Sequence, residues 1–131
     1  MQKDRFSDIS IATPFQACAI YYHDADRVEY VRRDVTSVHR RIDENLSLIL
    51  DFHSRKPVGF HINGFKALYL TEFKAEKEFA GEEFLALVHI IERLVGHIGD
   101  ALWTDRLRAY QSAHEIAKED SVELRDLPKA A

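Results

Sequence analysis

Hydrophobic and polar residues alternate along the first half of the chain and recur with a helical period in the second half. Alternation with a period of two is typical of strands that bury one face, whereas apolar residues at i, i+3, i+4 and i+7 are typical of amphipathic helices. Clusters of Asp, Asn, Ser and Pro separate the alternating segments and predict turns. The pattern predicts strands over residues 15–22, 28–32, 38–42, 46–53 and 58–62.

The last two of these strands form the clearest predicted hairpin, because residues 54–57 supply a turn between two apolar segments. A tight turn there sets His53 opposite Val58. That register divides the hairpin into two faces. One face holds Ile49, Asp51, His53, Val58, Phe60 and Ile62, and the other holds Leu48, Leu50, Phe52, Gly59 and His61. Both faces are largely apolar, so we expect both to need cover.

A helical stripe follows in the second half of the chain. Its apolar residues are Phe84, Leu87, Val88, Ile91, Leu94, Val95 and Ile98. This spacing predicts a helix over about 82–98. Gly99 suits the end of that helix and Asp100 the start of a second one over about 101–118. So short a connection predicts an antiparallel two-helix hairpin. Residues 65–81 fit either a strand or a helical turn, and both termini are expected to be loose.

The composition suits one compact domain. The chain has 131 residues, of which 46% are hydrophobic and 31% charged, and this mixture can bury a core. We therefore predict a single α+β domain over residues 1–131, with an antiparallel β-meander of four or five strands at about 15–63, followed by the two-helix hairpin. Neither a membrane span nor the apolar run of a secretory signal is evident, so we expect a soluble, cytoplasmic protein with no membrane partner.

The β half resembles a small prokaryotic family, domain-of-unknown-function family 2283, over roughly residues 19–64. The matching pieces are Tyr21, Ala25-Asp26, Val28 to Val31, Arg40 to Glu44, Leu48 to Asp51 and Val58 to Ile62. Tyr22, His53 and His61 stand where that family prefers acidic residues. The resemblance implies a β-meander, and it implies no reaction because the family has no assigned activity.

The candidates for chemistry are few. The seven histidines lack the His-x-x-x-His and Glu-x-x-His spacings of metal sites, and there is no phosphate-binding glycine loop, so we expect neither a metal nor a cofactor. The lone Cys18 lies in an apolar stretch, which favours a buried, inert thiol. Asp51 and His53 share a face in the expected register, so Asp51 could orient His53 as a general base. The alternative is a polar pair at the margin of the sheet.

The sharpest polar feature is basic. Five residues flank the predicted loop at 34–37, and they are Arg32, Arg33, His39, Arg40 and Arg41. If the strands on either side of this loop pair as a hairpin, these side chains converge in a ribbon that could contact phosphates. The alternative is ion pairing with Glu29, Asp34 and Asp43 on a solvated surface.

The overall charge opposes the nucleic-acid interpretation. The net charge is −4. Residues 1–66 carry 10 basic and 9 acidic side chains, net +1, and residues 67–131 carry 8 and 13, net −5. Such a balance gives no general attraction to phosphate.

No sequence motif indicates a function, so the functional prediction rests on the apolar surfaces of the predicted sheet and helix. Two apolar sheet faces and a wide helical stripe exceed what one small domain can cover, so we expect self-association as a dimer. The leading hypothesis is a non-enzymatic homodimeric interaction module. One alternative is a nucleic-acid-associated regulator that uses the basic ribbon, and another is a small enzyme with an Asp51–His53 site. The sequence names no small-molecule ligand.

Overall fold

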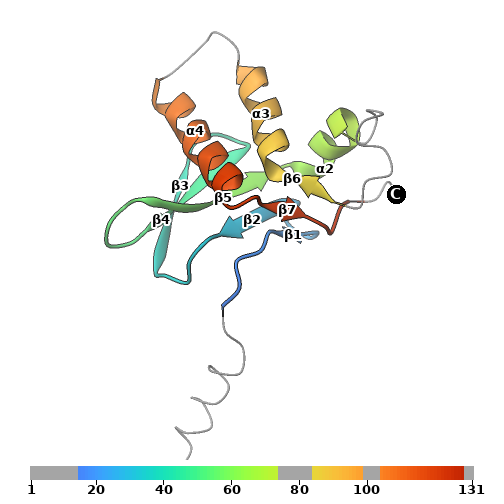
Figure 1. The fold of residues 1–131 in the computed structure, drawn as a ribbon. Helices are drawn as coiled ribbons and strands as arrows, with labels where there is room; N and C mark the ends of the chain where they lie inside the picture. The colour runs from blue at the N-terminus through green and yellow to red at the C-terminus, as the bar shows by residue number, and fades with distance from the viewer. Residues whose placement is uncertain (1–14, 74–83, 99–103, 129–131) are drawn as a thin grey trace, which may run out of the picture.

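A computed structural model of the chain describes residues 15–73, 84–98 and 104–128, and the fold is given for these (Figure 1). Five strands form the main sheet: β1 (Ile20–Tyr22), β2 (Arg27–Val31), β3 (Ser37–Arg41), β4 (Leu46–Asp51) and β5 (Pro57–Asn63). A short helix follows and continues as a π-helical turn: α2 (Phe65–Leu68) and η1 (Tyr69–Phe73). The remaining elements are β6 (Leu85–Ala86), α3 (Leu87–Ile98), α4 (Thr104–Glu119) and β7 (Glu123–Leu124). The α+β class with an antiparallel sheet and two helices is confirmed.

The strand order departs from a simple succession. The sheet runs β1-β2-β5-β4-β3, so β5 lies between β2 and β4, and every pairing is antiparallel. The conditional hairpin between β2 and β3 is therefore wrong, because these strands are separated by two others. The central place of β5 buries its apolar side chains between two neighbours, and Phe60 lies opposite both Tyr30 and Leu48.

The register of the β4–β5 hairpin also differs from the tight turn that was expected. Leu48 lies opposite Phe60, and a bulge follows Ile49, where Leu50 lies opposite Pro57. The turn is wider because Asp51 Oδ1 accepts hydrogen bonds from the backbone N–H groups of His53 and Ser54. The expected pairing is off by three residues, and an odd shift exchanges the two faces of one strand relative to the other.

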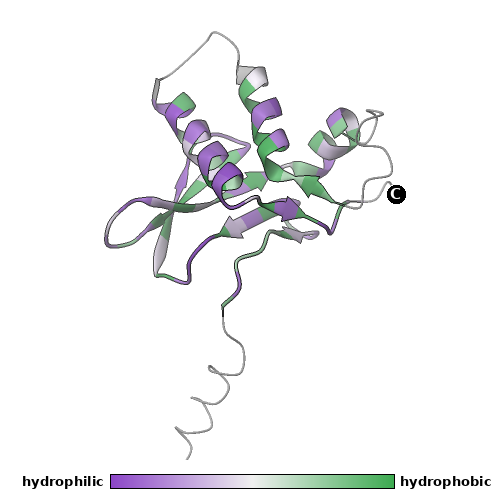
Figure 2. Ribbon diagram, viewed as in Figure 1, coloured by the Kyte–Doolittle hydropathy of each residue, from purple (hydrophilic) through white to green (hydrophobic). Residues whose placement is uncertain are grey.

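The core lies on the face of the sheet that the helices cover (Figure 1). Its strand residues are Val28, Tyr30, Leu46, Leu48, Phe60 and Ile62, and its helical residues are Leu87, Ile90, Ile91, Leu94, Ala109, Tyr110, Ala113, Ile116 and Ala117. Figure 2 shows that α4 turns a mainly hydrophilic side away from the sheet, as an amphipathic helix should. The buried alanines of α4 allow that helix to approach the sheet closely.

The start of the first long helix and the C-terminal tail both differ from the expectation. The first long helix begins at Leu87 rather than near residue 82, because Leu85 and Ala86 are extended and pair with β7. The tail beyond Asp120 is not loose over its described part, since Val122 and Leu124 are buried in the core. The second helix was expected to begin at about 101, and residues 99–103 lie outside the described residues.

The second face of the sheet carries a row of side chains from neighbouring strands. Glu29 on β2, His61 on β5 and Ser47 on β4 follow one another across the sheet. Ile49 lies in the next row, opposite Gly59. None of the helices within the described ranges packs on this face, and Ile49 is buried outside the main core cluster.

Candidate binding cleft

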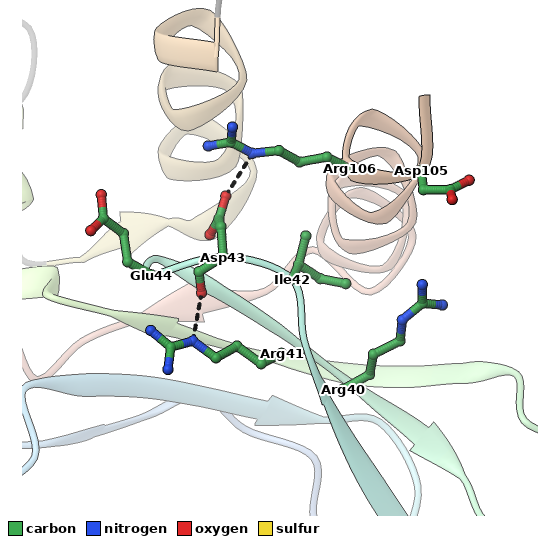
Figure 3. A pocket seen from close by; sticks show the side chains of 7 residues that line it. All are labelled: Arg40, Arg41, Ile42, Asp43, Glu44, Asp105 and Arg106. Carbon is green, nitrogen blue, oxygen red and sulfur yellow. Dashed lines mark hydrogen bonds and ion pairs between the residues drawn. The ribbon is translucent and has the colours of Figure 1, made fainter. Parts of the chain in front are cut away.

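A cleft of about 530 Å³ opens at the end of β3, between the turn that leads into β4 and the first turn of α4. Its lining residues are Arg40, Arg41, Ile42, Asp43, Glu44, Asp105 and Arg106. Figure 3 shows the three arginine side chains around the turn that carries Asp43. Arg40 and Arg41 belong to the basic cluster found in the sequence, whereas Arg106 comes from α4.

Asp43 holds this turn together. Its Oδ1 atom accepts the backbone N–H groups of Asn45 and Leu46, both at 2.8 Å. Its Oδ2 atom accepts the Tyr110 hydroxyl at 2.6 Å and Arg106 Nε at 2.9 Å. Burial raises the pKa of Asp43, but these four hydrogen bonds lower it by more, so the carboxylate stays ionised. Four donors fill the acceptor positions of one carboxylate.

The Tyr110 hydroxyl is held on the same carboxylate. Burial is the main cause that raises the pKa of Tyr110, and the hydrogen bond to Asp43 adds to it. Tyr110 is also one of the largest fully buried side chains. The β3–β4 turn and α4 are therefore joined by a polar contact at the margin of the core, which fixes the wall of the cleft.

The arginines differ in how they are held. Arg106 donates its Nε–H to the carboxylate of Asp43. Arg41 donates its Nε–H to the backbone carbonyl of Asp43 at 3.3 Å. Arg40 forms no hydrogen bond or ion pair with any part of the chain that the structure describes. Each guanidinium has five N–H donors in a planar fork that matches a carboxylate or phosphate. Most of these donors remain available in the cleft.

Two more carboxylates, Glu44 and Asp105, stand on opposite sides of the cleft (Figure 3). Both are exposed, and neither forms an ion pair with another described residue. The formal charge of the lining is therefore zero, three arginines against three acids. The cleft can attract an anion through directed donors, and it has no large positive field that would gather a polyanion.

The other basic candidates lie elsewhere. Arg32 donates to Glu119, the last residue of α4, and to Asp120, which follows it, at 2.9 to 3.0 Å, and its side chain is 19% exposed. Arg33 is exposed beside it. Arg32 follows the last residue of β2, which pairs with Gly59, whereas Arg41 pairs with Ser47. The two arginine pairs thus lie at opposite ends of the sheet, and the predicted ribbon does not form.

His39 joins a different group on the second face of the sheet. Its ring meets the His61 ring edge-on with centroids 4.6 Å apart. His61 Nε2 lies 2.5 Å from Glu29 Oε2, and His61 is 4% exposed. Burial is the main cause that lowers the pKa of His61, although Glu29 opposes the shift, so the ring is neutral and donates its Nε2–H to Glu29.

Asp51 and His53 take part in the turn between β4 and β5. Asp51 Oδ1 accepts the backbone N–H of His53 at 2.7 Å and that of Ser54 at 3.0 Å, and these bonds lower the pKa of Asp51. The His53 ring is exposed and meets the Phe52 ring edge-on. No hydrogen bond joins the two side chains among the contacts of the described residues. The geometry accounts for Asp51 as a turn-capping residue.

The expectation for Cys18 is wrong, because the thiol is exposed. It lines a second cavity of about 430 Å³ together with Tyr30 and Asp120. Burial raises the pKa of Tyr30 to about 12, helped by its hydrogen bond to Asp120. Across the described ranges, no group of three or more His, Cys, Asp and Glu side chains is placed to hold a metal ion, and no helix there is long and apolar enough to cross a membrane.

The sequence pointed to half of the cleft. The basic cluster in the sequence includes Arg40 and Arg41, and the sequence predicts Asp43 as an ion-pair partner for them. Arg106 and Tyr110 were missed, because they lie 63 and 67 residues from Asp43. One signal was available: residues 106 and 110 are four apart on the predicted helix, so they share a face.

Comparison with known proteins returns no match to a family model, to a curated protein or to a solved structure. The resemblance to domain-of-unknown-function family 2283 therefore stays a prediction.

Proposed function

We propose that the protein is a non-enzymatic binding module whose ligand is an anion that enters the arginine-lined cleft. One observation carries this proposal: Arg40, Arg41 and Arg106 line one cleft together with Asp43, whose carboxylate already accepts four hydrogen bonds. Asp43 therefore cannot accept the remaining guanidinium donors. An external carboxylate or phosphate can accept them in bidentate geometry.

The charge balance favours a ligand with dispersed negative charge over a polyphosphate. Glu44 and Asp105 stand on opposite sides of the cleft and would repel a densely charged anion there. A carboxylate carries one charge on two oxygens and can avoid both acids while it binds one guanidinium. We therefore expect carboxylates to bind better than polyphosphate of similar size.

A binding role also fits the chemistry of the lining. Asp43 is ionised, fully hydrogen-bonded and held by backbone groups, so it is a poor acceptor for a substrate proton. Arginine does not exchange protons at neutral pH. The described lining residues offer recognition without an evident nucleophile.

The test is a titration of the full chain with hexaglutamate and, separately, with tripolyphosphate, followed by calorimetry. We expect hexaglutamate to bind, and Arg40→Gln and Arg41→Gln to weaken it by about tenfold each, the usual effect of losing one charge-assisted contact. Arg33→Gln is the matched control, because Arg33 is an exposed arginine at the other end of the sheet. Absence of binding to both probes, or an equal loss in Arg33→Gln, would overturn the proposal.

A second candidate function is self-association through the second face of the sheet. Ile20 and Tyr22 on β1 are 44% and 39% exposed, large values for apolar side chains. Beside them, the Nε atom of Arg27 is buried and has no hydrogen-bond partner among the described residues. We infer that a second copy covers this face and supplies the missing acceptor.

Light scattering at micromolar concentration tests the self-association. We expect twice the chain mass of 15.2 kDa, and a return to the single mass in Tyr22→Glu. Phe52→Glu is the control, because Phe52 is also exposed but lies in the β4–β5 turn. A single mass that does not change with concentration would rule this candidate out.

A further inference from the structure

Strand β3 is an edge strand of the sheet. On its outer side, one row of backbone N–H and C=O groups has no partner strand among the described residues. Two hydrogen bonds fix its phase against β4, Phe52 N–H to the Thr36 carbonyl and Ile42 N–H to the Leu46 carbonyl. In an antiparallel pair, residues that bond to the neighbour alternate with residues that point away from it. The even-numbered residues of this segment therefore bond to β4.

The odd-numbered residues of β3 then face outward. Ser37, His39 and Arg41 each turn one N–H and one C=O toward the open edge, which gives six groups along five residues. None of these groups has a backbone partner among the bonds of the described chain. Such a row is a template for an added strand.

The side chains beside this edge are cationic on both faces. Arg40 lies opposite Leu48 on the helix-covered face and reaches the cleft that it shares with Arg106. His39 and Arg41 start from the second face of the sheet by register, and Arg41, at the end of β3, also lines the cleft. The opposite edge, β1, carries Ile20 and Tyr22 instead. Among the described residues, the β3 edge therefore combines free backbone groups with positive charge on both sides, and the β1 edge does not.

We propose that the anionic ligand of the cleft is an extended acidic peptide segment that pairs with β3 as a sixth strand. This inference rests on the proposed function and specifies its ligand. Successive side chains of a strand point to opposite faces, so alternate carboxylates of the peptide would reach Arg40 and Arg106 on one face and His39 and Arg41 on the other. The backbone bonds would supply affinity, and the arginines would select for acidic residues.

The charges favour an acidic partner over a second copy at this edge. Two β3 strands paired with each other would bring Arg40 and Arg41 of both copies together. Like charges across a strand pair are destabilising. The same charges protect the free edge from unspecific pairing, as in other edge strands.

The experiment compares peptides that differ only in their backbone. The first is an eight-residue peptide with blocked ends in which pairs of adjacent Glu residues alternate with Thr-Val pairs, so that Glu side chains point to both faces. The second is the same peptide methylated on alternate backbone nitrogens. Both are titrated into the full chain by calorimetry and by amide NMR. We expect the first peptide to bind and to shift the amides of Ser37, His39 and Arg41, and the methylated peptide to bind at least about tenfold more weakly.

A pair of variants tests the edge from the side of the protein. Proline is tolerated at an edge strand where its missing N–H faces solvent, so His39→Pro should fold and lose an outward donor. His39→Thr removes the same imidazole and keeps that N–H. We expect His39→Pro to bind the peptide about tenfold more weakly than His39→Thr. If His39→Pro does not fold, the methylated peptide alone decides.

The outcomes separate the two proposals. Equal binding of both peptides, with loss in Arg40→Gln, would leave the anion cleft intact and overturn the strand addition. Absence of binding to both peptides, to hexaglutamate and to tripolyphosphate would overturn both. Tighter binding of a DNA or RNA duplex than of the acidic peptide would overturn the choice of partner.

Discussion

His61 Nε2 lies 2.5 Å from Glu29 Oε2 across two neighbouring strands, on the sheet face that no described helix covers. Burial disfavours the charged ring, and Arg27 and His39 disfavour it further by repulsion. Glu29 acts in the opposite direction but does not compensate. The pair therefore sets a neutral imidazole against the Glu29 carboxyl group, and the burial of this imidazole sets how the fold responds to acid.

The first prediction is a loss of stability in weak acid. The pKa of His61 is lower in the folded chain than the ordinary value of about 6.5, so the unfolded chain binds more protons as the pH falls through that range. Urea melts should show a lower free energy of unfolding at about pH 5 than at about pH 7.5. The decrease should diminish in His61→Gln and persist in His53→Gln, whose ring is exposed in a turn. An unchanged decrease in His61→Gln would contradict the assignment.

A second prediction uses two glycines as a matched pair. A Cβ on Gly59 would collide with the Tyr30 carbonyl oxygen and lie 2.9 Å from the Val31 Cα, both rigid backbone atoms of β2. Gly59→Ala should therefore cost about 1–3 kcal/mol or more, as overpacking does. In α3, a Cβ on Gly96 would meet no atom of the described chain within 4 Å apart from its own neighbours and helix backbone, so Gly96→Ala should stabilise by about 0.5–1 kcal/mol. Equal effects in thermal melts would contradict this strand contact.

A third prediction concerns the core. Phe60 and Ile91 are both fully buried, one on β5 and one on α3. Phe60→Ala and Ile91→Ala should each cost about 2–5 kcal/mol in urea melts, because each removes a large side chain from a packed site. Phe52→Ala is the control, since Phe52 is 45% exposed and should cost well under about 1 kcal/mol. A cost below about 1 kcal/mol for Phe60 would mean that β5 does not lie at the centre of the sheet.

The sequence predicts the positions of strands and helices better than it predicts which strands pair with each other. Alternation predicted strands at Val28 and Tyr30, and both side chains are buried. The pairing of β2 with β5 was missed because it joins segments about 30 residues apart and depends on a backbone contact. Gly59 offered a signal, since a strand glycine indicates close approach of another backbone. The register error came from Asp51, whose side chain widens the turn that a tight hairpin would close.

The residues of the candidate cleft also fall into two groups, those that the sequence predicts and those that only the tertiary structure brings together. Arg40 and Arg41 were visible as charge in one segment. Their neighbour Arg106 became a neighbour only through the packing of α4 over the sheet, which brings it 2.9 Å from Asp43. Local patterns report which residues are basic or apolar. The convergence of side chains from distant elements depends on tertiary packing, which no local pattern contains.

The last prediction concerns nucleic acid, the alternative function raised by the basic cluster. Arg32 is bound to Asp120 and Glu119, and it lies at the other end of the sheet from Arg41, so the cluster presents no continuous basic ribbon. Salt-dependent attraction to DNA or RNA requires several cations that contact successive phosphates and release their counterions. We therefore expect no binding tighter than the weak non-specific range of about 10⁻⁴–10⁻⁶ M at physiological salt.

Fluorescence anisotropy with mixed DNA and RNA duplexes, at salt concentrations between about 50 and 200 mM, measures this affinity and its salt dependence. The acidic peptide with Glu on both faces serves as the comparison ligand, because the free edge of β3 should prefer it to either duplex. Submicromolar duplex affinity that is lost in Arg40→Ala/Arg41→Ala would contradict the prediction. It would mean that the arginines of the cleft bind phosphates, and that repulsion by Glu44 and Asp105 does not prevent a polyanion from binding.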